Sequence, residues 1–416
     1  MSLTTTRMDR ARAKEVRDLG PHPMERGGDG MNMQAKAQAR PDRGGDTADL
    51  LSEVLDEIRT RRAEFEQKAH VPRDMVDRLR AIGCYRAFVP ERFGGDALSP
   101  AAFCRLIETI SAADASTGWV ASFGVSSTYL SALPPETFAR IYADPDTVFA
   151  GAMFPPQAAT PEGDKLRVNG RWPWCSGSMG ADYIGVGIKL EGEATPLPRS
   201  AVLPRSEVEI DETWDTIGLR GTGSHEVVVT DKLVSEDWTF IRGSAPQMDD
   251  PQFRYPAMAL AAQVLAVVAL GTAREALDWI RSDAAQRASI TGAPNPGARP
   301  YVQADLARAE GILAGARHYF YDTIEAGWDE LLTQGEVSGD TKIALRMAAT
   351  KAAHDGAEAA RLAFTLGGSG GMMAGHPLGR CMIDAACVAQ HAFLNSGTWT
   401  AAGAGLFDQQ TPPGYP

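Results

Sequence analysis

Apolar residues recur every three or four positions from about residue 47, which is the period of a helix with one buried face. The first positions to show it are Leu50, Leu51, Val54, Leu55 and Ile58. Ser99 and Pro100 then form a common start signal for a further helix, because serine caps a helix and proline fits its first turn. The pattern predicts a helical domain over residues 47–146.

Short β-rich runs separated by turn residues replace the helical pattern after residue 147. These runs are 166–168, 183–188, 201–203, 208–210 and 227–229. Asn169 and Gly170 follow the first run, and this pair favours a tight turn. We predict a β-barrel domain over residues 147–242, inserted between helical parts of the chain.

Long stretches rich in alanine and leucine return near residue 256. They cover about 256–290, 300–333, 339–366 and 380–402. Four such stretches predict a C-terminal four-helix bundle over residues 243–405, with residues 406–416 as a tail. The fold is therefore expected to be mainly α with a central β domain.

Two segments of the sequence bear on whether the protein enters a membrane or is secreted. The apolar run 257–270 is interrupted by Gln263 and is shorter than the ~20 residues that a bilayer requires, so we interpret it as a buried helix and expect no membrane association. Residues 1–46 carry no sustained apolar period and no secretory signal, so we expect a flexible N-terminal extension. Five cysteines without a CxxC pair suit a reducing cytoplasm.

Charge and histidine spacing narrow the range of partners. The 416 residues contain 41 Lys and Arg against 53 Asp and Glu, a net charge of −12. This balance works against binding to nucleic acid or anionic membranes and favours small molecules. The seven histidines show no HExxH spacing and no accompanying acidic set, so the sequence implies no metal.

Three short strings carry a resemblance to known proteins. They are Ala115 to Val120 (ASTGWV), Asn169 to Gly177 (NGRWPWCSG) and Gly218 to Ser224 (GLRGTGS). The domain order over residues 47–405 resembles the acyl-CoA dehydrogenase superfamily, and the strings are similar to its two-component (group D) flavin-dependent monooxygenases. That branch includes the oxygenase components of p-hydroxyphenylacetate and seco-steroid hydroxylases, and dibenzothiophene monooxygenase.

A carboxylate beside the flavin distinguishes the dehydrogenases of this superfamily from its monooxygenases. An acyl-CoA dehydrogenase needs one beside the flavin to abstract an α-proton. Segments 255–274 and 367–383 contain no Asp or Glu, so oxygen chemistry is favoured over dehydrogenation. An acyl-CoA dehydrogenase-type flavoenzyme, an N- or S-oxygenating monooxygenase of the same fold, and a catalytically silent scaffold stay open as alternatives.

The resemblance implies a reaction in which reduced FMN or FAD and O2 form a C4a-hydroperoxide that hydroxylates an aromatic or polycyclic small molecule. No GxGxxG follows a strand, so the sequence itself favours a separate NAD(P)H-dependent flavin reductase as the source of electrons. The resemblance also implies a homo-oligomer, and we expect a tetramer.

Catalytic residues follow from the same resemblance. It implies that Trp174 packs on the isoalloxazine and that Ser176 hydrogen-bonds its N5, with an ordinary strand end as the alternative. It makes His391, in the last helix, a catalyst that takes a substrate proton or holds the peroxide, with a packing histidine as the alternative. Imidazole suits such a role because its pKa lies near the working pH.

Further site residues are implied by the resemblance. Those expected to bind the cofactor are Thr222, Ser224, Arg287, Gly367, Gly368 and Gly370. Arg287 would meet the flavin phosphate, and the glycines would approach the flavin of a neighbouring subunit; a solvated helix end and a helix C-cap are the alternatives. The expected substrate pocket includes Ser126, His376 and Asn395.

Overall fold

The computed structural model describes residues 44–195, 197–286, 292 and 294–415. The chain divides into two units, Met1–Gly45 and Asp46–Pro416, and nearly all of the described residues belong to the second. Apart from the start of the first helix, the extension predicted over residues 1–46 lies outside the described residues.

Helices form the first part of the second unit, as predicted. They are α1 (Gly44–Lys68), α2 (Arg73–Ala81), α3 (Pro100–Ser111), α4 (Ala115–Ala121), α5 (Ser126–Leu130) and α6 (Pro135–Ile141). The predicted start at Ser99 is confirmed, because its Oγ accepts a hydrogen bond of 3.2 Å from the Ala102 amide. Asp114 caps α4 in the same way, through a bond of 2.8 Å from the Thr117 amide.

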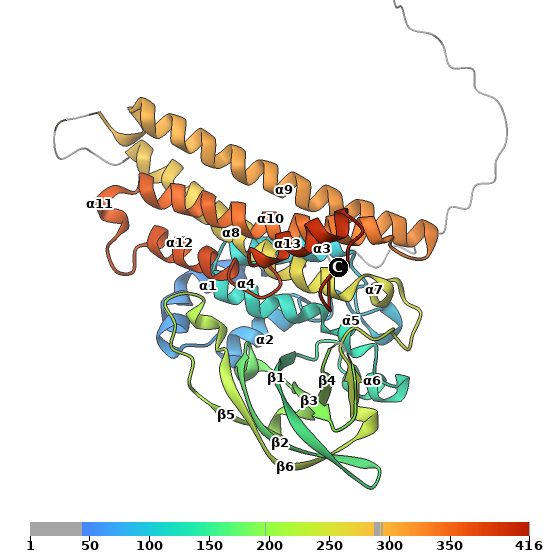
Figure 1. Cartoon of the computed structure of the whole chain (residues 1–416). Coiled ribbons are helices and arrows are strands. Elements are labelled where there is room, and N and C mark those ends of the chain that lie inside the picture. The colour runs from blue at the N-terminus through green and yellow to red at the C-terminus, as the bar shows by residue number, and fades with distance from the viewer. Residues whose placement is uncertain (1–43, 196, 287–291, 293, 416) are drawn as a thin grey trace, which may run out of the picture. The chain divides into compact units, whose positions relative to one another are not determined.

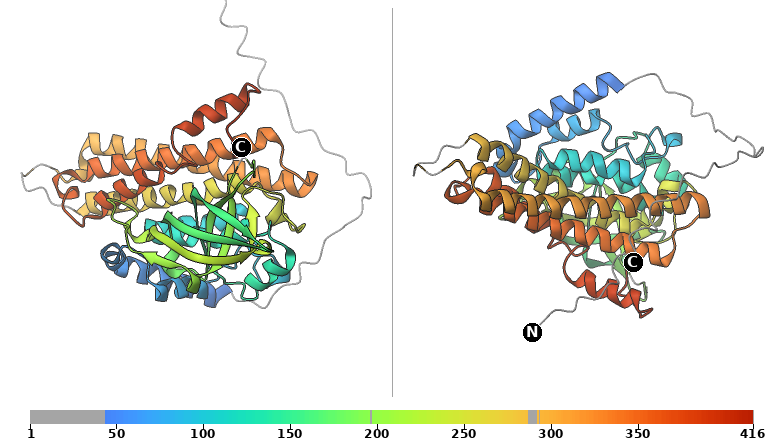
Figure 2. Two further views of the ribbon diagram at one scale, coloured as in Figure 1. Left: turned by 60° about the horizontal axis from the view of Figure 1, so that its bottom comes forward. Right: turned by 90° about the horizontal axis from the view of Figure 1, so that it is seen from above.

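The middle of the unit is one seven-stranded sheet (Figures 1 and 2). Its strands are β1 (Phe149–Glu162), β2 (Lys165–Cys175), β3 (Tyr183–Leu190), β4 (Arg199–Pro204), β5 (Glu209–Asp211), β6 (His225–Ser235) and β7 (Thr239–Ile241). The strand order is β5-β6-β2-β1-β3-β4-β7, and β1 pairs parallel with β3 whereas the other pairs are antiparallel. The described strands thus form the central β domain that the sequence predicts, with β5 and β7 at the two ends of the strand order.

Two strands escaped the sequence prediction. β1 contains Pro155 and Pro156, which cannot donate to a strand ladder and so hide the strand pattern. Its register with β3 shifts between Ala152 and Gln157, on either side of these prolines. β7 is only three residues long, too short for alternation to reveal.

Long helices form the C-terminal bundle (Figure 1). They are α8 (Ala257–Gln286), α9 (Pro300–Gln334), α10 (Gly339–Leu366), α12 (Pro377–Val388) and α13 (Gly397–Leu406), with short α7 (Pro251–Arg254) and α11 (Gly368–Gly371) beside them. α8 packs against α3, α10 and α12. Gly356 of α10 allows close approach, since a Cβ there would lie 2.8 Å from the Ala269 carbonyl.

Helix α8 is the core helix of the bundle. It is the one described helix long and apolar enough to cross a membrane, but 83% of its most apolar window is buried inside the structure. The interpretation of the 257–270 run as a buried helix is therefore confirmed.

The predicted helix over 380–402 is two helices, and the placement of His391 in the last helix is wrong. Residues 389–396 form a turn between α12 and α13. The His391 Nδ1 accepts from the Phe393 amide at 3.3 Å, and the Asn395 Oδ1 accepts from the Gly397 amide at 2.9 Å. These side chains compete with helical backbone bonds and interrupt the helix.

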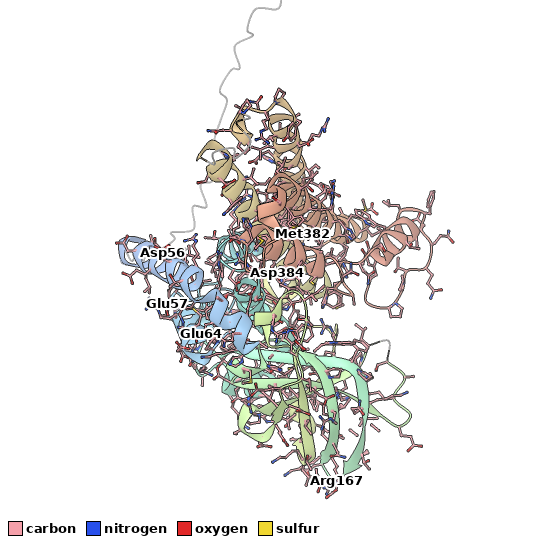
Figure 3. All side chains as sticks on the ribbon, turned by 90° about the vertical axis from the view of Figure 1, so that its left-hand side faces the viewer. Asp56, Glu57, Glu64, Arg167, Met382 and Asp384 are labelled. Atoms are coloured by element: carbon pink, nitrogen blue, oxygen red, sulfur yellow. The ribbon has the colours of Figure 1, made fainter. Side chains whose placement is uncertain are left out.

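A buried carboxyl on α12 anchors the loop of the Gly218–Ser224 string. Asp384 is 5% exposed, and its Oδ1 accepts a hydrogen bond of 2.6 Å from the Leu219 amide (Figure 3). Leu219 has a φ of +50°, a backbone conformation that needs such outside support. Burial raises the pKa of Asp384 to about 7, and the nearby Asp114 acts in the same direction.

Asp384→Asn should change how stability depends on pH. The raised folded-state pKa means that stability from Asp384 is full below about pH 4 and is lost as pH rises through about 7. Asparagine keeps the acceptor for Leu219 and cannot ionise. The free energy of unfolding, from urea titrations at pH 5 to 8, should therefore fall by ~1 to 4 kcal/mol more in the wild type than in the variant.

The exposed Asp408→Asn is the matched control and should follow the wild-type pH profile. Parallel profiles for wild type and Asp384→Asn would show that Asp384 ionises normally in the folded protein.

Candidate active site

A cavity of about 610 Å³ lies among the sheet, α4, α5, α8, α10 and the turn between α12 and α13. Its aromatic lining residues are Trp119, Phe123, Tyr129, Phe149, Phe154, Trp174, Phe240, Phe393 and Tyr415. Among the described lining residues there is no Asp, Glu or Lys, and there are two arginines, Arg242 and Arg346. The cavity has the size and apolar character of a small-molecule site.

Trp174 is turned out of the sheet toward this cavity. Its φ is +62°, and the register of β2 with β6 shifts between Trp172 and Cys175. The indole is 66% exposed, whereas Trp172 two residues earlier is fully buried. Left-handed backbone at a bulky residue is costly and is characteristic of functional sites. The strand end thus presents a flat aromatic face at the cavity wall.

A chain of hydroxyls runs from the cavity into the loop behind it. The Ser176 Oγ lies 2.6 Å from the Ser224 Oγ, which lies 2.8 Å from the Thr222 Oγ1. The Thr222 hydroxyl donates its proton to the Leu219 carbonyl at 2.8 Å. Of the three hydroxyls, only Ser176 lines the cavity, while Thr222 and Ser224 are buried behind it.

The direction of this chain follows from counting protons. Each hydroxyl has one proton to donate, and that of Thr222 is used on a carbonyl that can only accept. Ser224 must therefore donate to Thr222, and Ser176 must donate to Ser224. Ser176 is left with lone pairs toward the cavity and acts there as a hydrogen-bond acceptor.

His391 faces the cavity as a hydrogen-bond donor, whereas Ser176 faces it as an acceptor. Because its Nδ1 accepts from the Phe393 amide, the neutral ring carries its proton on Nε2, which bonds to no described residue. The ring packs edge-on against Trp119 and Phe393, with centroids 5.5 and 5.1 Å away. Burial lowers the pKa of His391 to about 4, and the charge of Arg242 adds to this. At neutral pH His391 is an uncharged donor.

The two arginines of the cavity differ in their partners. Arg346 is 2% exposed and donates to the carbonyls of Gly414 and Phe393, at 3.2 and 3.4 Å. The Arg242 guanidinium contacts two aromatic rings and makes no hydrogen bond or ion pair with any described residue. Burial lowers the pKa of both, which means that apolar surroundings disfavour each charge.

The C-terminal segment closes part of the cavity, which the sequence did not indicate. Residues 412–415 line it, and Tyr415 is buried against Ile343 and α13. Besides the bond from Arg346 to Gly414, the Thr411 hydroxyl donates to the Tyr415 carbonyl at 2.7 Å. Residues 412–415 of the predicted tail thus form part of the wall.

Ser126 and Asn395 line the cavity, as Trp174, Ser176 and His391 do. The Ser126 hydroxyl donates to the Phe123 carbonyl at 2.6 Å, so toward the cavity it also offers lone pairs. These five side chains come from three separate segments of the sequence and are brought together by the fold.

His376 does not line the cavity, and its place in a substrate pocket stays a prediction beside the alternative of a structural or subunit-contact role. Its Nδ1 accepts from the Leu378 amide at 3.2 Å, which caps α12, and its ring packs 4.5 Å from the Trp279 ring. The helix cap and the ring contact give His376 a structural role that needs no substrate.

The predicted flavin-binding glycines Gly367, Gly368 and Gly370 (the glycine string) do not line the cavity either. Gly367, Gly368 and Gly370 stand at the end of α10 and in α11, and a Cβ on Gly370 would meet no neighbouring atom. Their approach to the flavin of a neighbouring subunit stays a prediction. Arg287 lies outside the described residues.

Three metal-ligand side chains cluster elsewhere among the described residues. One ligand atom from each of His70, Glu212 and His225 lies within 4.8 Å of the others. The His225 Nδ1 accepts from the Trp214 amide at 3.1 Å, so its buried Nε2 carries the proton and has no lone pair for a metal. The group is better suited to hydrogen bonding than to metal binding.

Sequence reasoning missed Arg242, Arg346 and Asp384. Arg242 directly follows the short strand β7, and the local sequence does not set it apart. Arg346 and Asp384 sit within helices at positions that nothing in the local pattern sets apart.

Comparisons with known proteins agree with this arrangement. The family description "Acyl-CoA dehydrogenase, N-terminal domain" matches residues 49–133, and "Acyl-CoA dehydrogenase, C-terminal domain" matches residues 263–396. A structure of XiaF from Streptomyces sp., in complex with FADH2 and glycerol, has a TM-score of 0.81 at 22% identity and covers 89% of this chain and 98% of its own.

Two relatives narrow the family. An indole-3-acetate monooxygenase of Pseudomonas putida is 52% identical over 368 residues, which cover 88% of this chain and 94% of that protein. The flavin-dependent monooxygenase oxygenase subunit HsaA of Rhodococcus jostii is 32% identical over 187 residues, 44% of this chain and 49% of that protein. The chain belongs to the flavin-dependent monooxygenase branch of the acyl-CoA dehydrogenase superfamily.

Proposed function

We propose that this protein is the oxygenase component that hydroxylates the ring of indole-3-acetate or a closely similar indole acid. The observation that carries the proposal is the aromatic cavity in which an acceptor, Ser176, and an uncharged donor, His391, both face the bound molecules. The 52% identity to the indole-3-acetate monooxygenase of Pseudomonas putida supports the choice of substrate.

The residues present fit a flavin. An isoalloxazine ring needs a flat apolar face and polar partners at its edge, and the exposed indole of Trp174 stands two residues from Ser176. Trp174 and Ser176 would hold the ring. When bound, reduced flavin supplies two electrons with which one atom of O2 enters the substrate and the other leaves as water.

Ser176 suits the reduced form of the cofactor. Reduced flavin carries a proton on N5 and can donate there, whereas oxidised flavin offers a lone pair at the same atom. Because Ser176 is committed to donate to Ser224, it can accept from the first and finds no match in the second. The hydroxyl chain thus favours binding of FMNH2 or FADH2 over the oxidised cofactors.

His391 acts as a hydrogen-bond donor in this proposal. Its proton lies on Nε2, and its pKa of about 4 keeps the ring neutral through the working range. Of the two roles expected from the resemblance, donating to an oxygen atom fits this tautomer, and taking a substrate proton does not. The apolar walls contribute by excluding water, which strengthens such a bond.

The remaining expectations belong to the proposal as well. A separate NAD(P)H-dependent reductase would deliver the flavin, in keeping with the name "oxygenase subunit" of the Rhodococcus jostii relative. The exposed Met372 and Met373, beside the glycine string, support a homo-oligomer, for which we retain a tetramer. The free cysteines of the described residues suit the cytoplasm.

The residues of the cavity do not favour dehydrogenation of an acyl-CoA. Its described lining offers no carboxylate for α-proton abstraction. Asp384, which has a raised pKa, does not line the cavity and is occupied by the Leu219 amide.

The function is tested by single turnover. Protein mixed anaerobically with photoreduced FMN or FAD, then with O2 and indole-3-acetate, should yield an oxygenated indole that contains one ¹⁸O atom when ¹⁸O2 is used. Mass spectrometry measures the label. Stoichiometric hydrogen peroxide with no oxygenated indole would refute the proposal, and so would steady dye reduction with acyl-CoA thioesters.

His391→Ala should lower product yield per reduced flavin by ~10- to 100-fold, because one buried hydrogen bond to reacting oxygen is lost. Glutamine offers an N–H in a similar place, so His391→Gln should recover part of the yield. Flavin affinity should change less than ~3-fold in both. A wild-type yield that rises with an apparent pKa near 6.5, and loses this dependence in His391→Gln, would instead identify a base.

Ser224→Ala should weaken the preference for reduced flavin, because Ser176 is then free to turn its proton toward the cavity. The ratio of affinities for reduced and oxidised FMN, from anaerobic and aerobic titrations, should fall by ~5- to 10-fold. Ser178→Ala, in the same region but outside the hydroxyl chain, is the control. An unchanged ratio in Ser224→Ala would show that the chain does not set the polarity of Ser176.

A further inference from the structure

The charge of the cavity is opposite to that of the protein. The chain carries a net charge of −12, yet the described lining holds two guanidiniums and no carboxylate. Many other described arginines are paired with acids, as Arg274 is with Glu310 at 2.8 Å. Positive charge in apolar surroundings without a counter-ion is unfavourable until an anion binds.

Arg346 has a structural use that accounts for its charge. Its donors reach the carbonyls of Phe393 and Gly414, and its guanidinium lies 4.7 Å from the Tyr415 ring centroid. These contacts hold the C-terminal segment against the turn that carries His391. Both terminal nitrogens of Arg346 are therefore used by the protein itself, and its buried Nε has no hydrogen-bond partner among the described residues.

Arg242 has no such use. It follows β7, and its guanidinium carbon lies 5.7 Å from the Tyr129 ring centroid and 5.3 Å from that of Phe393. The two rings hold the group in place by cation–π contact without satisfying its N–H donors. A planar guanidinium held in this way matches a carboxylate, which accepts two of its hydrogen bonds side by side.

We propose that Arg242 binds the carboxylate of an aryl acid substrate and so makes the enzyme select acids over neutral aromatic molecules. The inference deepens the proposed function, on which it rests for the indole ring. Phe393 contacts both Arg242 and the ring of His391, at 5.3 and 5.1 Å, so the acid anchor and the donor share one wall. A substrate fixed by its carboxylate would thereby have its ring positioned relative to His391.

The test compares each acid with its uncharged amide. Indole-3-acetate and indole-3-acetamide, and phenylacetate and phenylacetamide, are titrated into the wild type, Arg242→Gln, Arg242→Lys and Arg140→Gln. Arg140 is exposed, lies outside the cavity and forms no ion pair with a described residue, so its variant controls for net charge. Calorimetry gives the dissociation constants, and thermal melting checks that each variant is folded.

The wild type should bind acids more tightly than amides. Arg242→Gln should weaken acid binding by ~10- to 100-fold and amide binding by less than ~3-fold. Arg242→Lys should keep part of the preference, because it retains a charge without the planar fork. Arg140→Gln should match the wild type. Equal loss for acids and amides in Arg242→Gln would overturn the inference and make Arg242 a packing residue.

A flavin phosphate is the other anion that Arg242 could meet, and a second titration separates the two. FMN and riboflavin differ by the phosphate alone. If Arg242→Gln weakens binding of FMN but not of riboflavin, while the preference for acids persists, Arg242 serves the cofactor and the inference fails.

Failure of the proposed function gives a different pattern. If single turnover yields no oxygenated indole but acids still outbind amides through Arg242, the carboxylate site stands and the indole assignment falls. If indole-3-acetate is oxygenated but the wild type shows no preference for acids, the function stands and the inference falls.

Discussion

The hydrogen bond from the Thr222 hydroxyl to the Leu219 carbonyl fixes the direction of the hydroxyl chain at the site. It takes the one proton that Thr222 can donate, and thereby fixes the direction of Ser224 and of Ser176. The Leu219 backbone, with its positive φ, is in turn held by buried Asp384. A carboxyl on α12 thus supports the polarity of a hydroxyl at the end of β2.

Ser176 accepts and His391 donates in the cavity, and the same kind of constraint fixes both roles. In each case a backbone or buried group uses one end of the side chain, and the other end faces the cavity with only one possible role. Burial adds to this for His391, because the low pKa leaves the donor form unchanged through the neutral range. The site is thereby prepared for its ligands before they bind.

The charge of the cavity depends on which charged groups are absent as well as on which are present. The acidic residues that an acyl-CoA dehydrogenase would need are absent from the described lining, and the carboxyl of Asp384, with its raised pKa, is used to hold a loop. The positive charges remain, one bound to backbone carbonyls and one held between aromatic rings. This arrangement suits an anionic aromatic molecule better than a thioester that must lose a proton.

The sequence by itself determined the helical and β regions, because their apolar periods differ and turn residues separate them, and it determined the start of α3 through Ser99. It also supplied Trp174 and Ser176 through a string that resembles the family, and His391 through its position in the expected last helix. Tertiary structure decided what these residues can do: the direction of a hydroxyl depends on Thr222, and the tautomer of His391 on a turn for which the local pattern predicts a helix. Arg242 shows most clearly what the sequence alone does not reveal. The two aromatic rings that contact its guanidinium come from α5 and from the turn after α12, and only the folded chain brings them together.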